Sequence, residues 1–245
     1  MASDLLLPTR KDEAFRYADL AALAPLWPVA EERIVLAAGE SRTLTLANIG
    51  ADAAARDLAV ELGAGASFTL HVLNAPGAYG RIAVRAVLGQ GAQFTLGAAQ
   101  LAGGEQTVEL VTEVTHAAPD AVSRQVVRSV AAGRATANYL GKVLVQPGAD
   151  GTDGEQSVRA MLLDRTATAN ARPELEIHAD DVKCAHGCAV GELDAGGLFY
   201  LASRGLPPAD AKRLMLQAFI AEAFTGAADE EALQEAALAA LEALL

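Results

Sequence analysis

Cysteine is scarce in this sequence. Only Cys184 and Cys188 occur in 245 residues, with three residues between them. Two thiols so close along the chain cannot form the disulfide framework that stabilises small secreted domains. We therefore expect free thiols and a cytoplasmic location.

Positive charge is also in short supply. Nineteen Lys and Arg residues stand against 31 Asp and Glu residues, which gives a formal net charge of −12 at pH 7. A chain with this charge repels phosphate groups. General binding to nucleic acid or to an anionic membrane surface is therefore excluded.

Long hydrophobic runs are missing as well. The start of the chain has no basic region before its three leucines at positions 5–7, so we do not expect a signal peptide. The longest stretch without a charged residue, 86–104, contains five Gly and three Gln and alternates in polarity. This composition excludes a membrane-spanning helix.

What the sequence does have is hydrophobic residues in quantity and an internal repeat. Hydrophobic residues make up 52% of the chain, which allows a large core and excludes wholesale disorder. Residues 62–70 (LGAGASFTL) recur as 88–96 (LGQGAQFTL), with seven of nine positions identical, and more weakly as 36–44 (LAAGESRTL). The offset is 26 residues each time, so a repeat architecture is indicated.

Each repeat has the pattern of two strands joined by a glycine turn. Phe68, Leu70 and Val72 alternate with Thr69 and His71, which is typical of β-strands. Twenty-six residues leave no room for two strands and an ordinary helix, so we predict a mainly β protein built as a parallel β-helix. A leucine-rich repeat and an ordinary β-sandwich are the alternatives.

The repeat fades after about residue 110, but strand-like runs continue at 107–116, 122–130, 136–145 and 157–163. Coils of variable length would explain the lost register. We assign residues 1–30 to an N-terminal segment, 31–190 to the β-helix core and 191–245 to a C-terminal helical region.

Three helices are predicted in the C-terminal region. The first spans 194–204 and ends at Gly205, and the third begins at residues 229–231 and runs to Leu245. The second follows two prolines and ends before Gly226, with one apolar face made of Ala211, Leu214, Met215, Ala218, Phe219 and Phe224. Such a tail either caps the open end of the stack or docks a partner protein, and the pattern favours neither.

Potential metal ligands are densest around Cys184, His186 and Cys188. Thiols and an imidazole suit a soft metal such as iron or zinc, but a closed four-coordinate site needs more ligands at better spacing. A metal here would need a ligand from elsewhere, and the alternative is an ordinary strand end. Lys183 is expected to favour the Cys184 thiolate.

The remaining candidates are weaker. We expect His71 and His116 at outward strand positions without a role. A carbohydrate-cleaving groove is conceivable from Asp150, Asp153, Arg159, Asp164 and Arg165, although scattered surface charges explain these residues better. The chain has neither a phosphate-binding loop nor a nucleophile elbow, so nucleotide hydrolysis and α/β-hydrolase chemistry are not indicated.

The C-terminal third resembles a known family. Residues 173–187 (PELEIHADDVKCAHG), 190–194 (VGELD) and 198–205 (LFYLASRG) are similar to the C-terminal motif of the SufB/SufD family of iron–sulfur cluster assembly proteins. Gly141-Lys142, Gln156 and residues 7–17 (LPTRKDEAFRY) match further family motifs. His186 followed by Gly is typical of the SufD branch rather than the SufB branch.

The resemblance implies a right-handed parallel β-helix and a non-catalytic subunit of the Suf machine, not an enzyme. It implies pairing with a SufB-like scaffold, with Cys184 and His186 at that interface and Cys188 as an extra ligand or incidental. A transient iron–sulfur cluster or iron would be held only in the assembled complex, not tightly by this chain alone. A SufC-like ATPase would dock on the C-terminal helices, through residues that include Leu198, Phe199, Tyr200, Arg204, Leu214 and Phe219.

Three functional hypotheses follow from the sequence. The first is the SufD-like subunit; the others are a β-helix enzyme acting on polysaccharide and a self-assembling β-helix scaffold. The chain is also shorter than is typical of the SufD branch, which leaves the role of the family's N-terminal helical domain open here. Whether the isolated chain is a monomer or a homodimer is open as well.

Overall fold

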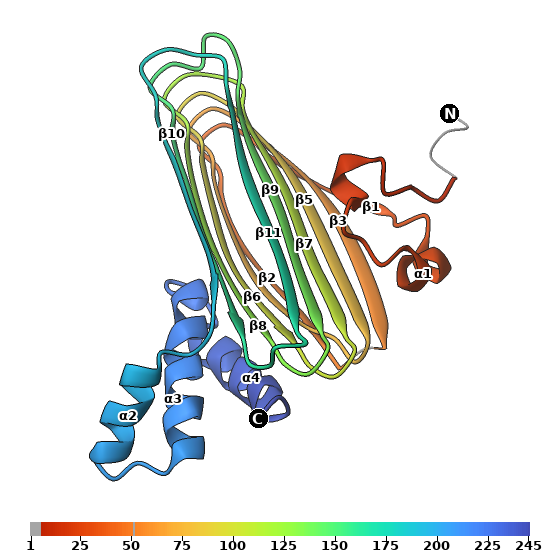
Figure 1. Ribbon diagram of the computed structural model, residues 1–245. Coiled ribbons are helices and arrows are strands. Elements are labelled where there is room, and N and C mark those ends of the chain that lie inside the picture. Colours follow the sequence, from red (N-terminus) through yellow and green to blue (C-terminus); the bar gives the residue numbers. More distant parts are fainter. Residues whose placement is uncertain (1–5, 51) are drawn as a thin grey trace.

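The computed structural model describes residues 6–50 and 52–245. Within these residues, parallel strands form two sheets that face each other (Figure 1). The odd-numbered sheet contains β1 (Glu31–Leu36), β3 (Ala53–Leu62), β5 (Tyr79–Leu88), β7 (Thr107–His116), β9 (Thr136–Val145) and β11 (Thr168–Ile177). The even-numbered sheet contains β2 (Ser41–Ile49), β4 (Ser67–Ala75), β6 (Gln93–Ala102), β8 (Val122–Ala131), β10 (Asp153–Leu162) and β12 (Lys183–Gly191).

The chain alternates between the two sheets, so each odd strand and the following even strand make one coil of a parallel β-helix. All pairings between coils are parallel. The predicted β-helix is therefore confirmed, and the leucine-rich repeat and the β-sandwich are wrong.

The 26-residue repeat corresponds to the pairing of the first coils, in which residues 26 positions apart lie side by side. Leu36 pairs with Leu62, and Leu62 with Leu88. The repeated glycines take positive φ angles at the turns, which residues with a Cβ rarely adopt: Gly39 (72°), Gly65 (65°) and Gly91 (64°). Later coils are longer than 26 residues, as the spacing between paired residues shows: Thr107 pairs with Thr136, and Thr136 pairs with Thr168. The expected variation in coil length is thus confirmed.

The interior of the coils is mostly apolar. Inward side chains such as Phe68, Leu70 and Val72 are fully buried and stack on the equivalent residues of the next coil. Burying side chains of this size stabilises the fold by about 1.5–3 kcal/mol each. Alternation along each strand thus separates the core from the two outer faces.

Four of the buried polar side chains in this core form one network. Thr112 Oγ1 donates to Gln125 Oε1 at 2.9 Å, Tyr139 Oη lies 3.2 Å from Thr112 Oγ1, and Gln156 Nε2 donates to Tyr139 Oη at 3.0 Å. Gly141 makes room for the network, because a Cβ at this position would overlap the Tyr139 hydroxyl. The network therefore joins β7, β8, β9 and β10.

One of the two strand histidines lies on the face opposite to the predicted one. His116 points inward, in register with the core residues Leu88 and Val145, and bonds Ser123 Oγ at 2.9 Å. Burial lowers the pKa of His116 to about 4. The expected outward position is wrong for His116, because it shares the inward side of β7 with Val108, Leu110 and Val114. His71 does face outward, but the C-terminal helices bury it.

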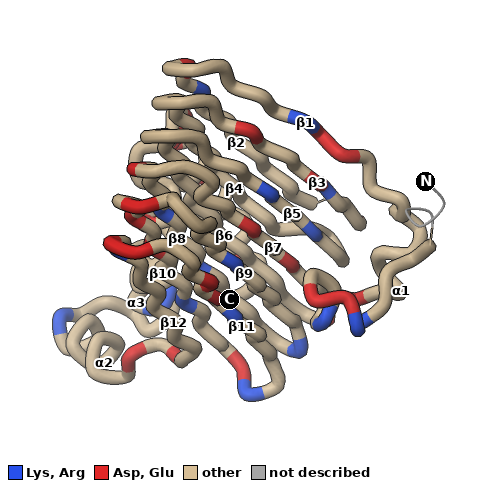
Figure 2. The backbone as a smooth tube through the Cα atoms, turned by 90° about the horizontal axis from the view of Figure 1, so that it is seen from above, with Lys and Arg blue, Asp and Glu red and all other residues tan. Residues whose placement is uncertain are grey.

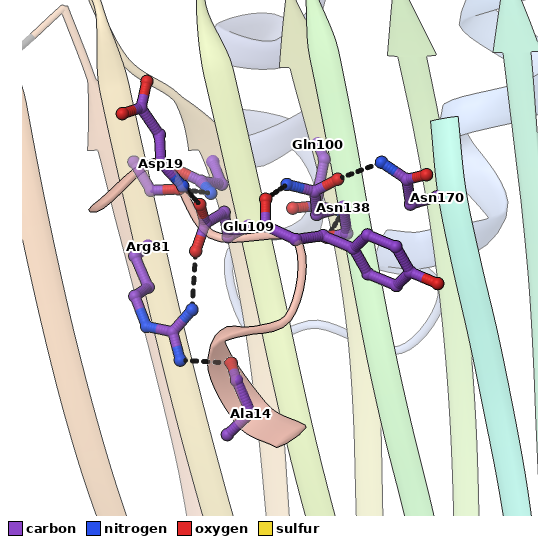
Figure 3. A network of polar contacts seen from close by, with 10 residues as sticks. Ala14, Asp19, Arg81, Gln100, Glu109, Asn138 and Asn170 are labelled. Carbon is purple, nitrogen blue, oxygen red and sulfur yellow. Dashed lines mark hydrogen bonds and ion pairs between the residues drawn. The ribbon is translucent and has the colours of Figure 1, made fainter. Parts of the chain in front are cut away.

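The N-terminal segment lies on the outer face of the odd-numbered sheet (Figure 1). It contains η1 (Glu13–Phe15), α1 (Leu20–Leu23) and η2 (Ala24–Leu26), while the first five residues of the predicted segment lie outside the described residues. Polar contacts fix it to the sheet (Figure 3): Glu109 accepts from the Asp19 backbone N–H at 2.8 Å and pairs with Arg81, and Asn138 donates to the Tyr17 carbonyl at 2.9 Å.

The C-terminal helices cover the outer face of the even-numbered sheet. They are α2 (Ala195–Ser203), α3 (Pro208–Ala221), η3 (Glu222–Phe224) and α4 (Glu230–Glu242). A second core joins Leu73, Leu101 and Val130 of the sheet to residues of the helices, among them Leu216, Ile220, Phe224 and Leu233. The helices lie along the side of the stack, so the alternative that they cap its open end is wrong. Among the described residues, these helices and α1 are too short or too polar to cross a membrane.

The predicted apolar face of the second helix is confirmed only in part. Ala211, and Phe224 of η3, are buried as expected, but the other buried positions of α3 are Leu216 and Ile220, whereas Leu214 and Ala218 are exposed. The reason is that α3 has two neighbours: the sheet and α4 on one side, and α2, through Met215, on the other. Gly97 allows the close approach to the sheet, because a Cβ there would overlap the carbonyl oxygen of Ala223.

Candidate functional site

The candidate site lies on β12, the last strand of the even-numbered sheet. β12 pairs with β10 on one side only, and β11 ends the odd-numbered sheet in the same way. Figure 2 shows β11 and β12 at one end of the stack and β1 at the other. Among the described residues, no further strand pairs with β11 or β12, so this end presents two adjacent strand edges.

The register places the three candidate ligands on one face of β12. Cys184, His186 and Cys188 pair with Gly154, Gln156 and Val158 of β10. Gln156 and Val158 are buried in the interior of the coils. Cys184, His186 and Cys188 therefore lie over the open end of the β-helix, the first half-buried and the other two exposed.

The two thiols have different surroundings. Cys184 packs against the core above Gly154, whose missing Cβ would lie 3.5 Å from both Cys184 Sγ and Ser123 Oγ. Cys188 Sγ lies 3.7 Å from the carbonyl oxygen of Ala171 on β11. Cys188 thus reaches across from the even-numbered sheet to the odd-numbered one.

Burial sets the acidity of both thiols. It raises the pKa of Cys184, and nearby Asp153 raises it further; it also raises the pKa of Cys188. The expectation that Lys183 favours the Cys184 thiolate is therefore wrong. Lys183 alternates with Cys184 and lies on the opposite face of β12, next to Asp153.

The described residues do not bring a group of metal ligands together at this edge. No group of three or more His, Cys, Asp or Glu side chains in the described ranges is arranged to hold a metal ion. Alternate residues of a strand are roughly 6.6 Å apart, whereas metal–sulfur and metal–nitrogen bonds are about 2.0–2.3 Å long. Cys184, His186 and Cys188 therefore offer donors suited to iron, but one ion needs further ligands from elsewhere.

Beyond Lys183, the β12 edge also lacks the charges that usually keep strand edges apart. No residue from 184 to 191 is charged, and Val190 is 47% exposed. β1, at the other end of the stack, begins with Glu31, Glu32 and Arg33. Charged residues block strand addition at an edge, whereas an uncharged edge permits it. Val190 and Ile177 were missed in the sequence, because only the fold shows that no coil follows them.

The predicted docking residues divide into exposed and packed ones. Phe199 (76% exposed), Tyr200 and Leu214 are exposed apolar side chains on α2 and α3. Arg204 lies over the Tyr200 ring, with 5.2 Å between its guanidinium carbon and the ring centroid. Leu198 is half-buried, and Phe219 packs against the second core. No residue of α2 is buried, so this helix presents an apolar surface.

The charged residues considered for a carbohydrate-cleaving groove do not meet. Asp153 begins β10 and pairs with Arg124 at 2.6 Å. Asp164 follows the other end of β10 and accepts a hydrogen bond from the Gly133 N–H. A strand of this length separates the two carboxylates by on the order of 30 Å. They cannot act together on one glycosidic bond, which needs two carboxyl groups within about 10 Å.

Comparison with known proteins connects this edge to a family. The model of the SUF system FeS cluster assembly family, SufBD core domain, matches residues 31–219, from the start of β1 into α3. The chain belongs to this family. The resemblance found in the sequence is therefore confirmed for most of the chain.

Named relatives match over about half of the chain. It is 38% identical over 117 residues to "Iron-sulfur cluster assembly protein SufD" of Escherichia coli (strain K12), 48% of this chain and 27% of that protein. It is 36% identical over 125 residues to "Iron-sulfur cluster assembly SufBD family protein slr0076" of Synechocystis, 51% of this chain and 28% of that protein. It is 37% identical over 119 residues to "Protein ABCI7, chloroplastic" of Arabidopsis thaliana, 48% of this chain and 25% of that protein. The matched part thus covers little more than a quarter of each relative's length.

We expect both thiols to react slowly with iodoacetamide at about pH 7.5, compared with a cysteine in an unfolded peptide, whose pKa is about 8.5. The raised pKa of each thiol leaves less thiolate at this pH, so the rate should keep rising above pH 8.5. The measurement is a pH–rate profile of the Cys184→Ser and Cys188→Ser variants, each of which retains one thiol. A titration midpoint below that of the peptide thiol in either pH–rate profile would contradict the raised pKa of that cysteine.

Proposed function

We propose that this chain is a non-catalytic, SufD-like subunit of Suf iron–sulfur cluster assembly and acts in the cytoplasm. One observation carries the proposal: β12 combines an unpaired edge, uncharged from residue 184 on, with Cys184 and His186 over the open end of the β-helix. Family membership and the similarity to the SufD protein of Escherichia coli support it. The ligands on this edge are too few for one ion, which points to a site completed by another chain.

The partner at this edge would be a SufB-like scaffold. A strand edge of the partner can add to β12 through backbone hydrogen bonds, while exposed Val190, and Ile177 at the end of β11, supply apolar contact. A symmetric homodimer through the same edge is the competing arrangement for the isolated chain.

The iron–sulfur cluster would be the cargo of this interface rather than a resident cofactor. Cys184 and His186 would supply ligands from this chain, and the scaffold would supply the others. Thiolate and imidazole are both common ligands of iron–sulfur centres. Cys188 lies on the same face of β12 and can replace or supplement Cys184.

The apolar surface of α2 and α3 would dock a SufC-like ATPase. Phe199, Tyr200 and Leu214 are exposed there, and large aromatic side chains dominate the binding energy of many protein interfaces. Arg204 next to the Tyr200 ring supplies a positive charge at the rim. α2 follows β12 after only three residues, so the two proposed surfaces are covalently adjacent.

Pairing through β12 is tested with a charge at its edge. We expect Val190→Lys to weaken binding to a co-expressed SufB-like scaffold by about 30-fold or more, because the interface would bury an unpaired charge. Binding is measured by size exclusion and titration calorimetry. The control is Val35→Lys, which places the same charge on an equally exposed strand at the other end of the stack. Equal losses in both variants would argue against this edge.

The ligand role is tested on the assembled complex. We expect the Cys184→Ala/His186→Ala double variant to lower the iron and acid-labile sulfide bound per complex by about tenfold, because two ligands of the cargo are lost. Circular dichroism should show an unchanged β-helix, because both side chains lie at its open end. A Cys188→Ala variant measures the extra thiol separately. Full cluster content in the double variant would defeat the ligand role.

Docking on the helices is tested with Phe199→Ser. We expect the affinity for a SufC-like ATPase to fall by about 30-fold, because an exposed aromatic contact is removed, while the thermal stability of the chain stays the same. The matched control is Val87→Ser, which removes an exposed apolar side chain from the odd-numbered sheet. Unchanged affinity in the Phe199 variant would exclude this surface.

A further inference from the structure

Arg128 on β8 is an unusual residue for the outer face of a sheet, because its side chain is 0% exposed. Its guanidinium crosses to the neighbouring strand β10. Nη1 donates to the carbonyl oxygens of Val127 and Ser157, both at 2.8 Å, and Nη2 donates to Ser157 Oγ at 2.9 Å. Arg128 thus binds both the backbone and the side chain of β10.

The same guanidinium also holds the C-terminal helices. Nε donates to Glu222 Oε2 at 3.0 Å, and Nη2 lies 2.8 Å from Glu222 Oε1, which makes a two-pronged ion pair with η3. The Phe219 ring of α3 covers the guanidinium, with 5.9 Å from its central carbon to the ring centroid. One buried charge therefore joins the helices to β10.

Ser157 is close to the candidate site. It pairs with Gly187, which lies between His186 and Cys188 on β12. Contacts therefore run without a gap from Glu222 through Arg128 and Ser157 to the strand that carries the candidate ligands. A second connection is the chain itself, because β12 leads into α2 through residues 192–194.

Arg124, four residues earlier on β8, shows what is specific to Arg128. Arg124 makes the same contacts with β10: Nη1 donates to the carbonyl oxygens of Ser123 and Asp153, both at 3.0 Å, and Nη2 pairs with the Asp153 carboxylate. Arg124 is half-exposed, however, and its ion pairs are with Asp153 and Glu155 of β10. Only Arg128 of these two adds a link to the helices.

We propose that Arg128 is a positioning residue that couples the helical docking surface to the β12 edge. The proposal rests on the function assigned above to these two surfaces. Arg128 holds η3, β8 and β10 in one arrangement, so a displacement of the helices by a bound partner is transmitted to β10 and to the pairing of Ser157 with Gly187. Leaving such a charge buried without its partners is costly, so the helices and β10 move together rather than separately.

The first experiment is hydrogen–deuterium exchange on the full chain, comparing wild type with Arg128→Met and Arg124→Met. We expect Arg128→Met to accelerate exchange by about tenfold in three places: 219–224, 157–159 and 186–189. Arg124→Met should accelerate exchange near 153–155 and leave 219–224 unchanged. Faster exchange in the helices alone, with 157–159 and 186–189 unchanged, would overturn the coupling. If Arg128→Met does not fold, Glu222→Gln removes the charge from the exposed side of the same ion pair and should act on the same three segments.

The second experiment tests transmission directly. Binding of a SufC-like ATPase should change the rate at which Cys188 reacts with iodoacetamide in wild type and in Arg124→Met, but not in Arg128→Met. A response that persists in Arg128→Met overturns the coupling while docking stands. If the ATPase does not bind the wild-type chain, the docking function fails, and the exchange experiment still decides whether Arg128 couples the two regions.

Discussion

Hydrogen bonding between parallel strands determines this fold, because the backbone N–H and C=O groups of each coil bond to those of the coils before and after it. The same constraint that stacks β2 through β10 cannot be met at the last coil, where β11 and β12 have no neighbour beyond them among the described residues. Side chains that would be core residues in any other coil are exposed there. The chemistry of Cys184, His186 and Cys188 is therefore a consequence of their position in the stack rather than of a pocket.

The described parts of the N-terminal segment and of the C-terminal helices leave this end free. The N-terminal segment covers part of the odd-numbered sheet, and the C-terminal helices cover part of the even-numbered sheet, each with its own polar anchors (Figures 1 and 3). Neither element lies on β12. The two side faces are thus closed by the chain itself, and the end of the stack is available for another polypeptide.

Much of this architecture could be predicted from the sequence because it is local and periodic. Gly39, Gly65 and Gly91 share one turn conformation and one spacing, and the strand boundaries of β7 and β9 follow from alternation alone. The outward position expected for His116 was wrong although alternation with Val108, Leu110 and Val114 of β7 places it inward. The exposed face of α3 depends on which neighbours it has, and the role of Arg128 depends on a contact 94 residues away in sequence. Such features arise from tertiary packing, which a single sequence does not display.

The buried polar network of Thr112, Gln125, Tyr139 and Gln156 bears on how the coils find their alignment. Sliding a strand by two residues keeps every side chain on its own face, so alternation of polarity alone does not forbid it. Such a slip would separate the hydroxyls and amides of four strands and leave each of them in an apolar interior without a partner. The network thus favours the correct register over the shifted one in the coils next to β12. The positions of the Cys184 and Cys188 thiols along β12 therefore depend on the register that this network fixes.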